Sequence, residues 1–352
     1  MLRAGIEGGE VNGSQKIIEP AAMPVAISVS PRAVAATEAL PARTLLALPL
    51  ATAFALVIHF FASKNEPPVE THSYLLFLGV VFVAAIVIAV AQPFWPGLRR
   101  WMRGMCPILA AAVALLGGWE VITAGQRWLP MPYFPSPAGV LQSLINDRSL
   151  IFDGTWHSLL LLIGGYAMGV FSGVVTGVCI GWFEPARYWG MPVLKVVGPI
   201  PATAWIPLAM VVSPSSMISA IALIALAVWF PVTMLTASGI SNTRASYLDV
   251  ARTLGASRAY LIFRVAIPAA MPNIFIGLFM GLGASFLTLV VAETVGVKSG
   301  LGWYLSWAQG WAEYGKVYGA LVIMAAFFST IMTVLFKVRD RVLVWQKGTI
   351  KW

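Results

Sequence analysis

Two acidic side chains occur in or beside long apolar stretches of this sequence, Glu120 and Glu293. An ionised carboxylate in an apolar layer is costly, so a residue of this kind is a candidate for a functional role. Two interpretations stay open for Glu120, lining of a pore and packing between helices. Glu293 lies near the end of its apolar stretch, where it has the alternative of reaching an aqueous interface.

Other residue types that often do chemistry form no site in the sequence. Cys106 and Cys179 fall in apolar segments without disulfide or metal-ligand spacing, which indicates small packing residues. His59, His72 and His157 are scattered along the chain. No Gly-x-x-x-x-Gly-Lys-[Ser/Thr] phosphate loop occurs. We therefore expect no catalytic residue, no metal site and no cofactor in this chain, and any ATP must be used by another polypeptide.

The elements that position these residues follow from composition. Apolar residues make up 59% of the 352 residues and charged residues only 11%, against about 25% charged in an average soluble domain. Eight apolar runs are long enough to cross a hydrocarbon layer, which takes about 20 residues. They extend from Arg43 to Ser63, Ser73 to Gln92, Met105 to Ala124, Ser158 to Phe183, Lys195 to Val212, Met217 to Thr236, Ile274 to Glu293, and Val317 to Phe336. Continuous runs without strand alternation favour helices, so we predict an all-α membrane protein, a polytopic bundle of about eight transmembrane helices.

The positive charges indicate how this bundle is oriented. A net charge of +9 is compatible with nucleic-acid binding, but 18 of the 23 Lys and Arg residues fall on one side of the predicted bundle and only 5 on the other. Cytoplasmic segments of membrane proteins carry such an excess. The distribution predicts that both termini are cytoplasmic, that membrane lipid surrounds the bundle, and that nucleic acid is not a partner.

The chain divides into segments of different composition. Residues 1–42 contain no long apolar run and predict a cytoplasmic tail of low order. Residues 43–95 hold the first two spans, which we interpret as an accessory two-helix hairpin. The remaining spans occupy residues 105–342 and include a polar cytoplasmic loop at 241–273, and residues 343–352 form a second cytoplasmic tail.

Glycines recur every four residues on two of the predicted helices. The longer ridge comprises Gly165, Gly169, Gly173, Gly177 and Gly181, and the shorter one comprises Gly277 and Gly281. Such ridges let another backbone approach closely. We assign both to helix packing, either within the core or across a subunit interface.

Three prolines interrupt predicted spans, namely Pro201, Pro207 and Pro231. A proline-broken backbone at membrane depth is tolerated where it is buried in protein or lines a cavity. Together with Glu120 and Glu293, these prolines are our candidates for the wall of a pathway across the membrane.

The polar loop between the sixth and seventh spans contains a short amphipathic helix. Leu248, Ala251 and Leu254 recur at helical spacing, and Gly255 can terminate the helix. An exposed apolar stripe at a membrane surface needs a partner.

This loop resembles the EAA loop of ABC importer permeases, in which Glu-Ala-Ala is followed by three residues, Gly, nine residues, Ile, any residue and Leu-Pro. The matching positions, all in register, are Asp249, Val250, Ala251, Gly255, Val265, Ile267 and Pro268, of which four are conservative departures. The resemblance implies that the helix docks in a groove of a cytoplasmic ATPase and couples ATP hydrolysis to the membrane helices. The residues implied in this docking are Leu248, Asp249, Ala251, Arg252, Leu254, Gly255, Ala256 and Pro268.

Other stretches resemble the nitrate, sulfonate and taurine branch of these permeases. They are Leu129-Pro-Met-Pro with Phe134-Pro-Ser-Pro, the run from Pro199 to Leu208, and Ala292-Glu293 followed by Ser299-Gly-Leu-Gly. The resemblance extends from about Met105 to Asp340 and implies the six-helix core of a type I importer permease in a bacterial inner (plasma) membrane.

The same resemblance implies the partners and the cargo class. The partners are a cytoplasmic ABC ATPase dimer, which binds ATP and Mg, a second permease copy, and a periplasmic or lipoprotein substrate-binding protein. The cargo is a small anion such as nitrate, a sulfonate, taurine or bicarbonate, with a small organic heterocycle as the alternative. A secondary transporter would show inverted repeats and paired carboxylates, and neither is evident in the sequence.

Overall fold

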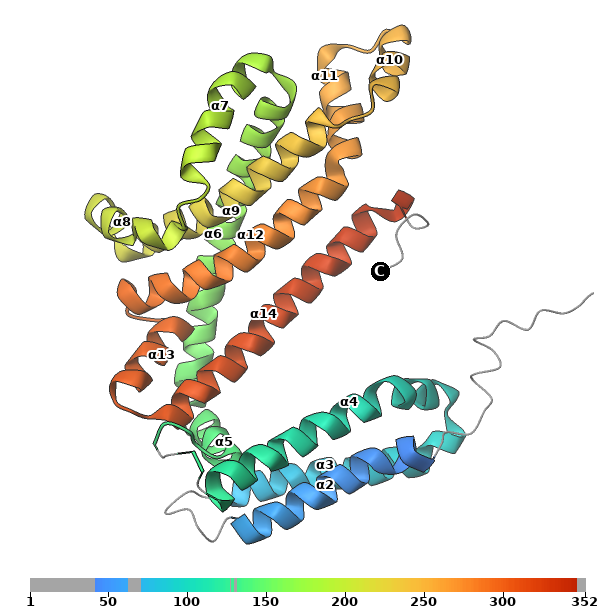
Figure 1. The fold of residues 1–352 in the computed structure, drawn as a ribbon, viewed down its shortest axis with the longest axis vertical. Coiled ribbons are helices and arrows are strands. Elements are labelled where there is room, and N and C mark those ends of the chain that lie inside the picture. Colours follow the sequence, from blue (N-terminus) through green and yellow to red (C-terminus); the bar gives the residue numbers. More distant parts are fainter. Residues whose placement is uncertain (1–41, 63–70, 127, 130–131, 347–352) are drawn as a thin grey trace, which may run out of the picture.

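The computed structural model describes residues 42–62, 71–126, 128–129 and 132–346. Over these residues every regular element is helical (Figure 1). The α-helices are α2 (Ala42–Ala62), α3 (His72–Ala91), α4 (Pro96–Glu120), α5 (Pro137–Asn146), α6 (Arg148–Trp182), α7 (Glu184–Val197), α8 (Ile206–Val212), α9 (Ser216–Ser241), α10 (Ala245–Thr253), α11 (Arg258–Tyr260), α12 (Ile267–Val295), α13 (Leu301–Gly310) and α14 (Tyr314–Val342). Short 3-10 segments are η2 (Gln92–Phe94), η4 (Ala202–Trp205) and η6 (Val344–Gln346), and π-helical segments are η3 (Val121–Gly125) and η5 (Leu261–Ala266).

The predicted all-α membrane fold is confirmed. In the described part of the chain, seven helices are long and apolar enough to cross a membrane, and an eighth span results if α7 and the η4–α8 segment are counted as one broken span. Of the predicted tails, residues 1–41 and 347–352 lie outside the described residues, and η6 occupies part of the second tail.

The fifth predicted span, Lys195 to Val212, is wrong as a continuous helix. The chain forms α7, bends by 85°, and continues through η4 and α8. Pro199 and Pro201 lie in the break. Neither has a backbone N–H, and each disfavours helical geometry in the residue before it, so two prolines this close together favour a break in the helix.

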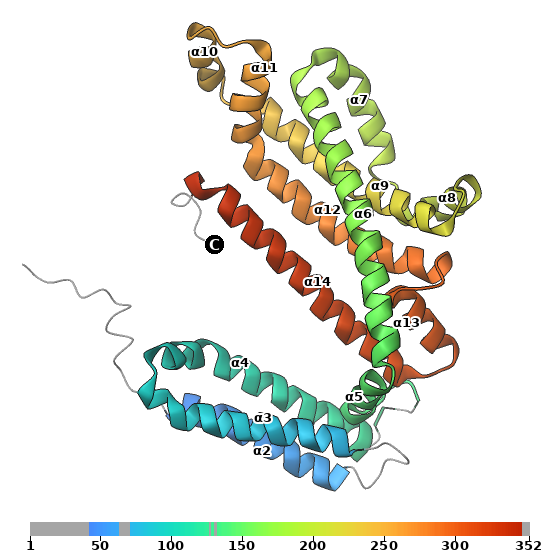
Figure 2. The ribbon, with the colours of Figure 1, turned by 180° about the vertical axis from the view of Figure 1, so that it is seen from behind.

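The core is organised around α9, which lies between α6 and α12 (Figures 1 and 2). The longer glycine ridge of α6 faces α9 along its whole length. A Cβ added at Gly165 would lie 2.6 Å from Ile224, and one added at Gly181 would lie 2.7 Å from Ile240. The shorter ridge, Gly277 and Gly281 on α12, contacts α9 around Val232 and Val228. In the structure both ridges therefore pack within the subunit.

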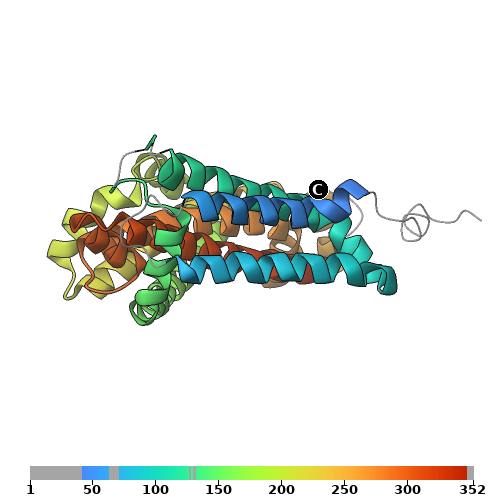
Figure 3. The same cartoon turned by 90° about the horizontal axis from the view of Figure 1, so that it is seen from below.

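The first three α-helices of the described residues, α2, α3 and α4, form a separate group together with η3, the N-terminal bundle. Seen from below, α2, α3 and α4 lie side by side (Figure 3). Met102 and Cys106 of α4 are buried against Leu48 of α2 and Ala85 of α3. The division of the chain at residue 95 stays a prediction, but α4 packs with the predicted hairpin as its third helix.

Candidate functional site

The break between α7 and η4 forms one wall of a cavity of about 300 Å³, the break cavity. Its other walls come from α9 and α12. Its lining residues are Val197, Gly198, Ile200, Pro201, Ala202, Thr203, Leu226, Ala227, Phe230, Pro231, Met280, Ala284, Leu287 and Thr288. Two of the three candidate prolines, Pro201 and Pro231, thus line one cavity, whereas Pro207 begins α8 and is exposed outside it.

Uncharged groups make up the surface of the break cavity. Among the described residues that line it none carries a charge, and its polar side chains are Thr203 and Thr288. Pro231 lies inside α9. Because proline has no N–H, the carbonyl of Ala227, one turn earlier, lacks its helical donor. The cavity therefore offers hydroxyl and carbonyl groups to a small polar molecule, with no fixed charge.

The break cavity is open on one side of the single chain. Leu287, Met280 and Ile200, which line it, are 67%, 58% and 39% exposed. Sequence reasoning did not find Thr203 and Thr288, because a threonine in an apolar run has no local feature that separates cavity lining from helix packing.

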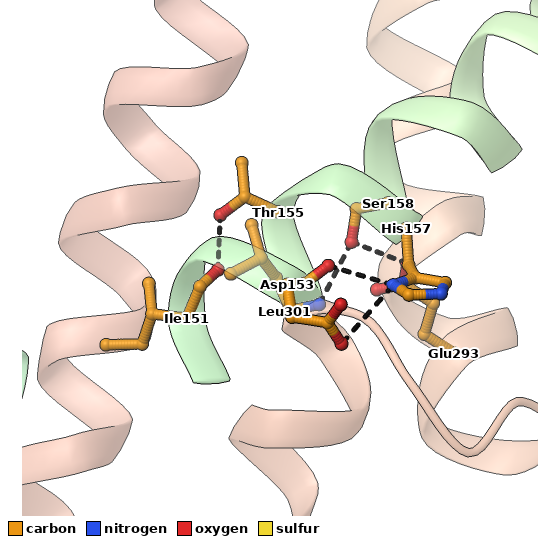
Figure 4. Close-up of polar contacts among 7 residues, drawn as sticks. All are labelled: Ile151, Asp153, Thr155, His157, Ser158, Glu293 and Leu301. Atoms are coloured by element: carbon orange, nitrogen blue, oxygen red, sulfur yellow. Dashed lines mark hydrogen bonds and ion pairs between the residues drawn. The ribbon is translucent and has the colours of Figure 1, made fainter. Parts of the chain in front are cut away.

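Glu293 lies outside this cavity and is fully enclosed in protein. Its Oε1 accepts a hydrogen bond from Ser158 Oγ of α6 at 2.6 Å, and its Oε2 accepts one from Gly302 N of α13 at 2.7 Å. Ser158 Oγ in turn accepts from Leu301 N at 2.9 Å (Figure 4). The side chain therefore does not reach an aqueous interface, which was the alternative suggested by its place in the sequence.

The glycines near Glu293 make room for its carboxyl group. Gly300 has φ +117°, and a Cβ added there would collide with the Glu293 carboxyl. A Cβ at Gly302 would lie 2.6 Å from the carbonyl oxygen of Val290. We call Glu293, Ser158 and the first turn of α13 the α13 clamp. It satisfies N–H groups that the start of a helix otherwise leaves without partners, and it joins α6, α12 and α13.

A second polar network lies beside α13. Tyr304 Oη donates to Asp147 Oδ2 at 2.8 Å, and Lys316 Nζ is 3.1 Å from the same oxygen and 2.7 Å from Glu313 Oε2. Burial, and then the hydrogen bond to Asp147, raise the pKa of the Tyr304 phenol above its usual range. The phenol therefore stays a hydrogen-bond donor, and the network connects the start of α6 to α13 and α14.

The predicted loop helix is α10, which projects from one end of the molecule (Figure 1). Its end is closed by two hydrogen bonds, from Gly255 N to Arg252 O at 2.9 Å and from Ala256 N to Ala251 O at 3.0 Å. This pair is the Schellman pattern, which needs a left-handed residue after the helix. Gly255 has φ +81° and supplies it.

The exposed apolar face of α10 differs from the predicted stripe. Leu254 is 83% exposed, as a docking residue should be, but Leu248 and Ala251 are half-buried, and α10 packs against η5 of its own chain. The other exposed large apolar side chains of α10 are Tyr247 and Val250. Together with Leu254 they are spaced i, i+3 and i+7, a pattern that could have identified the face from sequence.

Of three further implied docking residues, two lie in α10 and one in α12. Asp249 and Arg252 form an exposed ion pair at 3.0 Å within the helix, a contact of small energetic value in water. Pro268 occupies the first turn of α12.

Glu120 lies in the N-terminal bundle, at the end of α4. It is 1% exposed and hydrogen-bonds His59 of α2. It does not line the break cavity. The described residues contain no group of three His, Cys, Asp or Glu side chains that could hold a metal ion.

The arrangement is that of a multi-pass helical membrane protein with a broken span, an internal cavity and a helix exposed for a partner. Residues 165–343 match the family of binding-protein-dependent transport system inner membrane components, and the chain belongs to this family. It is a permease subunit of the ABC transporter class.

Curated relatives place it in the nitrate, sulfonate and taurine branch. A putative aliphatic sulfonates transport permease of Bacillus subtilis is 30% identical over 65% of this chain and 83% of its own length. The taurine transport system permease of Escherichia coli is 30% identical over 58% of this chain and 77% of its own length. The nitrate import permease of Leptolyngbya laminosa is 29% identical over 58% of this chain and 75% of its own length.

Proposed function

We propose that this chain is the membrane subunit of an ATP-driven importer in a bacterial inner (plasma) membrane, with both termini in the cytoplasm. It forms the pathway for a small anion of the nitrate, sulfonate, taurine or bicarbonate class, which a substrate-binding protein delivers. A cytoplasmic ATPase dimer binds ATP and Mg. The relatives named for aliphatic sulfonates, taurine and nitrate support this cargo class.

A second copy of the chain completes the pathway in this proposal. The break cavity is open, with Leu287, Met280 and Ile200 exposed along it. These side chains lie next to uncharged polar groups that a small solute could contact. Two copies that face each other across this opening would enclose such a solute.

The observation that carries the proposal is the exposed helix α10 and its closure at Gly255. Tyr247, Val250 and Leu254 present an apolar face at the end of the molecule, which fits a helix docked in a groove of the ATPase. The long helical run that begins at Arg258 follows directly, so force applied to α10 reaches the membrane helices.

Replacement of Gly255 by Val tests this role. No atom lies within 4 Å of a Cβ added at this position, so the only obstacle is φ +81°, which a β-branched residue adopts with difficulty. We expect the complex to lose most of the ATPase stimulation by loaded binding protein, about fivefold or more, because coupling free energies are typically of that size. Membrane insertion should be unchanged.

Gly255→Asn is the matched control, because Asn tolerates the left-handed region and adds a side chain in the same place. It should keep most of the stimulation. Full stimulation and transport in Gly255→Val, at equal abundance, would show that α10 does not couple the ATPase to transport.

The uncharged wall of the break cavity favours a second candidate cargo, a small neutral heterocycle. Thr203, Thr288 and the Ala227 carbonyl could hydrogen-bond such a molecule as well as an anion. Uptake of labelled taurine, nitrate and a neutral pyrimidine by the same reconstituted complex would separate the two candidates.

A further inference from the structure

A buried polar cluster occupies the N-terminal bundle. His59 of α2, Tyr74 of α3 and Glu120 of α4 are 3%, 3% and 1% exposed. His59 Nδ1 is hydrogen-bonded to Glu120 Oε1, and the Tyr74 ring meets the His59 ring edge-on at 5.0 Å between centroids. Glu120 Oε2 and Tyr74 Oη are buried and have no hydrogen-bond partner among the described residues. Thus α2, α3 and α4 each contribute one titratable side chain to the same buried cluster.

The surroundings of this cluster are apolar. Tyr74 packs with Ala55, Leu78 and Ala138 in a small hydrophobic cluster. No other charged side chain of the described residues is buried in the bundle. At this end α2 contributes His59, α3 contributes Tyr74 and the exposed His72, and α4 contributes Glu120, whereas η3 and α5 contain no titratable residue.

The number of protons on the His59–Glu120 pair decides its charge. Relative to a neutral imidazole and a carboxylate, one added proton makes the pair neutral overall. This holds whether the proton sits on the imidazole beside a carboxylate or on the carboxyl group. A second proton leaves a charge of +1 in an apolar site. An uncompensated buried charge is strongly unfavourable. Acid should therefore drive the two side chains out of their enclosed position.

We propose that the His59–Glu120 pair is a proton-binding site that makes the packing of α2 against α4 and α3 sensitive to pH. The pair with one proton holds the three helices together, and uptake of a second proton loosens them. Tyr74 covers the pair. Glu120 Oε2 can accept the incoming proton, and the Tyr74 hydroxyl can hydrogen-bond a water molecule that delivers it. This site lies outside residues 165–343, which match the family.

The pair lies close to one end of the N-terminal bundle. His59 lies in the last turn of α2, Tyr74 in the first turn of α3, and Glu120 is the last residue of α4. All three are therefore at the same end of the bundle, which faces outward in the proposed orientation. The site is thus placed to respond to the pH outside the cell.

Thermal unfolding of the full-length chain with its ATPase in lipid nanodiscs, between pH 8 and pH 5, tests the proposal. We expect the unfolding midpoint of the wild type to fall by about 4 °C or more toward pH 5 relative to the His59→Gln/Glu120→Gln double variant, whose amide pair keeps a hydrogen bond and does not titrate. His72→Gln, which replaces an exposed histidine of the same bundle, is the matched control. Its unfolding midpoint should fall toward pH 5 as much as that of the wild type. The same acid-induced fall in the double variant, or its loss in His72→Gln, would overturn the proposal.

A cross-link provides a second test that keeps both titrating residues. A Cβ at Gly117 would lie 3.7 Å from the Ala55 Cβ, within the range that a disulfide bridges. Oxidised Ala55→Cys/Gly117→Cys protein has α2 fixed to α4 near the pair. We expect the acid-induced fall in the unfolding midpoint of the oxidised protein to be less than half that of the same protein after reduction. Wild type treated with the same oxidant is the control. Equal falls in the oxidised and reduced forms would contradict the proposal.

Discussion

Removal of the Glu293 carboxyl group should release α13 without changing substrate affinity. In the structure this group accepts hydrogen bonds from Ser158 Oγ and Gly302 N in a fully buried site. Each bond left unmade in such a site costs about 1–3 kcal/mol, so Glu293→Ala should destabilise the clamp by about 2–6 kcal/mol. The lower figure corresponds to about 30-fold faster opening.

Hydrogen exchange at Leu301, Gly302 and Tyr304 measures this opening directly. In Glu293→Ala these amides should exchange about 30-fold faster or more, while amides of α9 keep their protection. Glu293→Gln is the conservative comparison. Its amide oxygen can accept from Gly302 N and its amide nitrogen can donate to Ser158 Oγ, so most of the protection should return.

Transport kinetics distinguish a clamp from a substrate contact. A clamp predicts that Glu293→Ala lowers the maximal rate and that Glu293→Gln restores it, with the KM for cargo similar in both. A charged substrate contact predicts that Gln is as damaging as Ala and that KM rises. Unchanged exchange at Leu301 and Gly302 in Glu293→Ala would refute the clamp.

Three further predictions concern other parts of the structure. Gly165→Ala should destabilise the protein by about 1–3 kcal/mol through overpacking, because the added Cβ would lie 2.6 Å from Ile224. Gly164→Ala should be nearly neutral, because its Cβ would lie 3.7 Å from Ile221. Equal unfolding midpoints for the two variants would contradict the packing of α6 on α9. Tyr304→Phe should lower the free energy of unfolding by about 1 kcal/mol. Because the pKa of Tyr304 is raised in the folded protein, the difference in stability between wild type and variant should stay constant up to about pH 10. Above that pH it should shrink, because ionisation of the phenol favours the open state. Reporter fusions at Arg100 and Ser143 should lie inside and outside the cell, and a reversal of either would exclude the proposed orientation.

Local spacing predicted the helices and the helix end at Gly255 because these features depend on neighbouring residues. A four-residue glycine repeat puts all its members on one face, so a packing ridge was predictable. The helix that packs against this ridge was not predictable, because the sequence does not say which helix approaches it. The prolines at 199 and 201 were also visible in the sequence, but residues 195–212 are mostly apolar and therefore looked like a single span.

The roles of the two buried acids depend on contacts that sequence spacing does not reveal. Glu120 meets His59, 61 residues away, and Glu293 meets Ser158, 135 residues away. Both acids looked alike in the sequence, as carboxyl groups in apolar stretches. The structure separates them, since one shares a hydrogen bond with a titratable partner and the other accepts from a hydroxyl and a backbone amide.

The helix α12 connects the three regions considered for function. The helical run from Arg258 to Val295 comprises 38 residues and is therefore about 57 Å long at 1.5 Å per residue. It begins beside α10, lines the break cavity with Met280 and Thr288 in its second half, and contributes Glu293 to the α13 clamp near its end. Its π-helical segment η5, Leu261–Ala266, lies at the α10 end, where an irregular turn permits bending. Beyond this point the packing of Gly277 and Gly281 against α9 makes the run stiff, so a displacement at α10 should move the cavity wall and the clamp together.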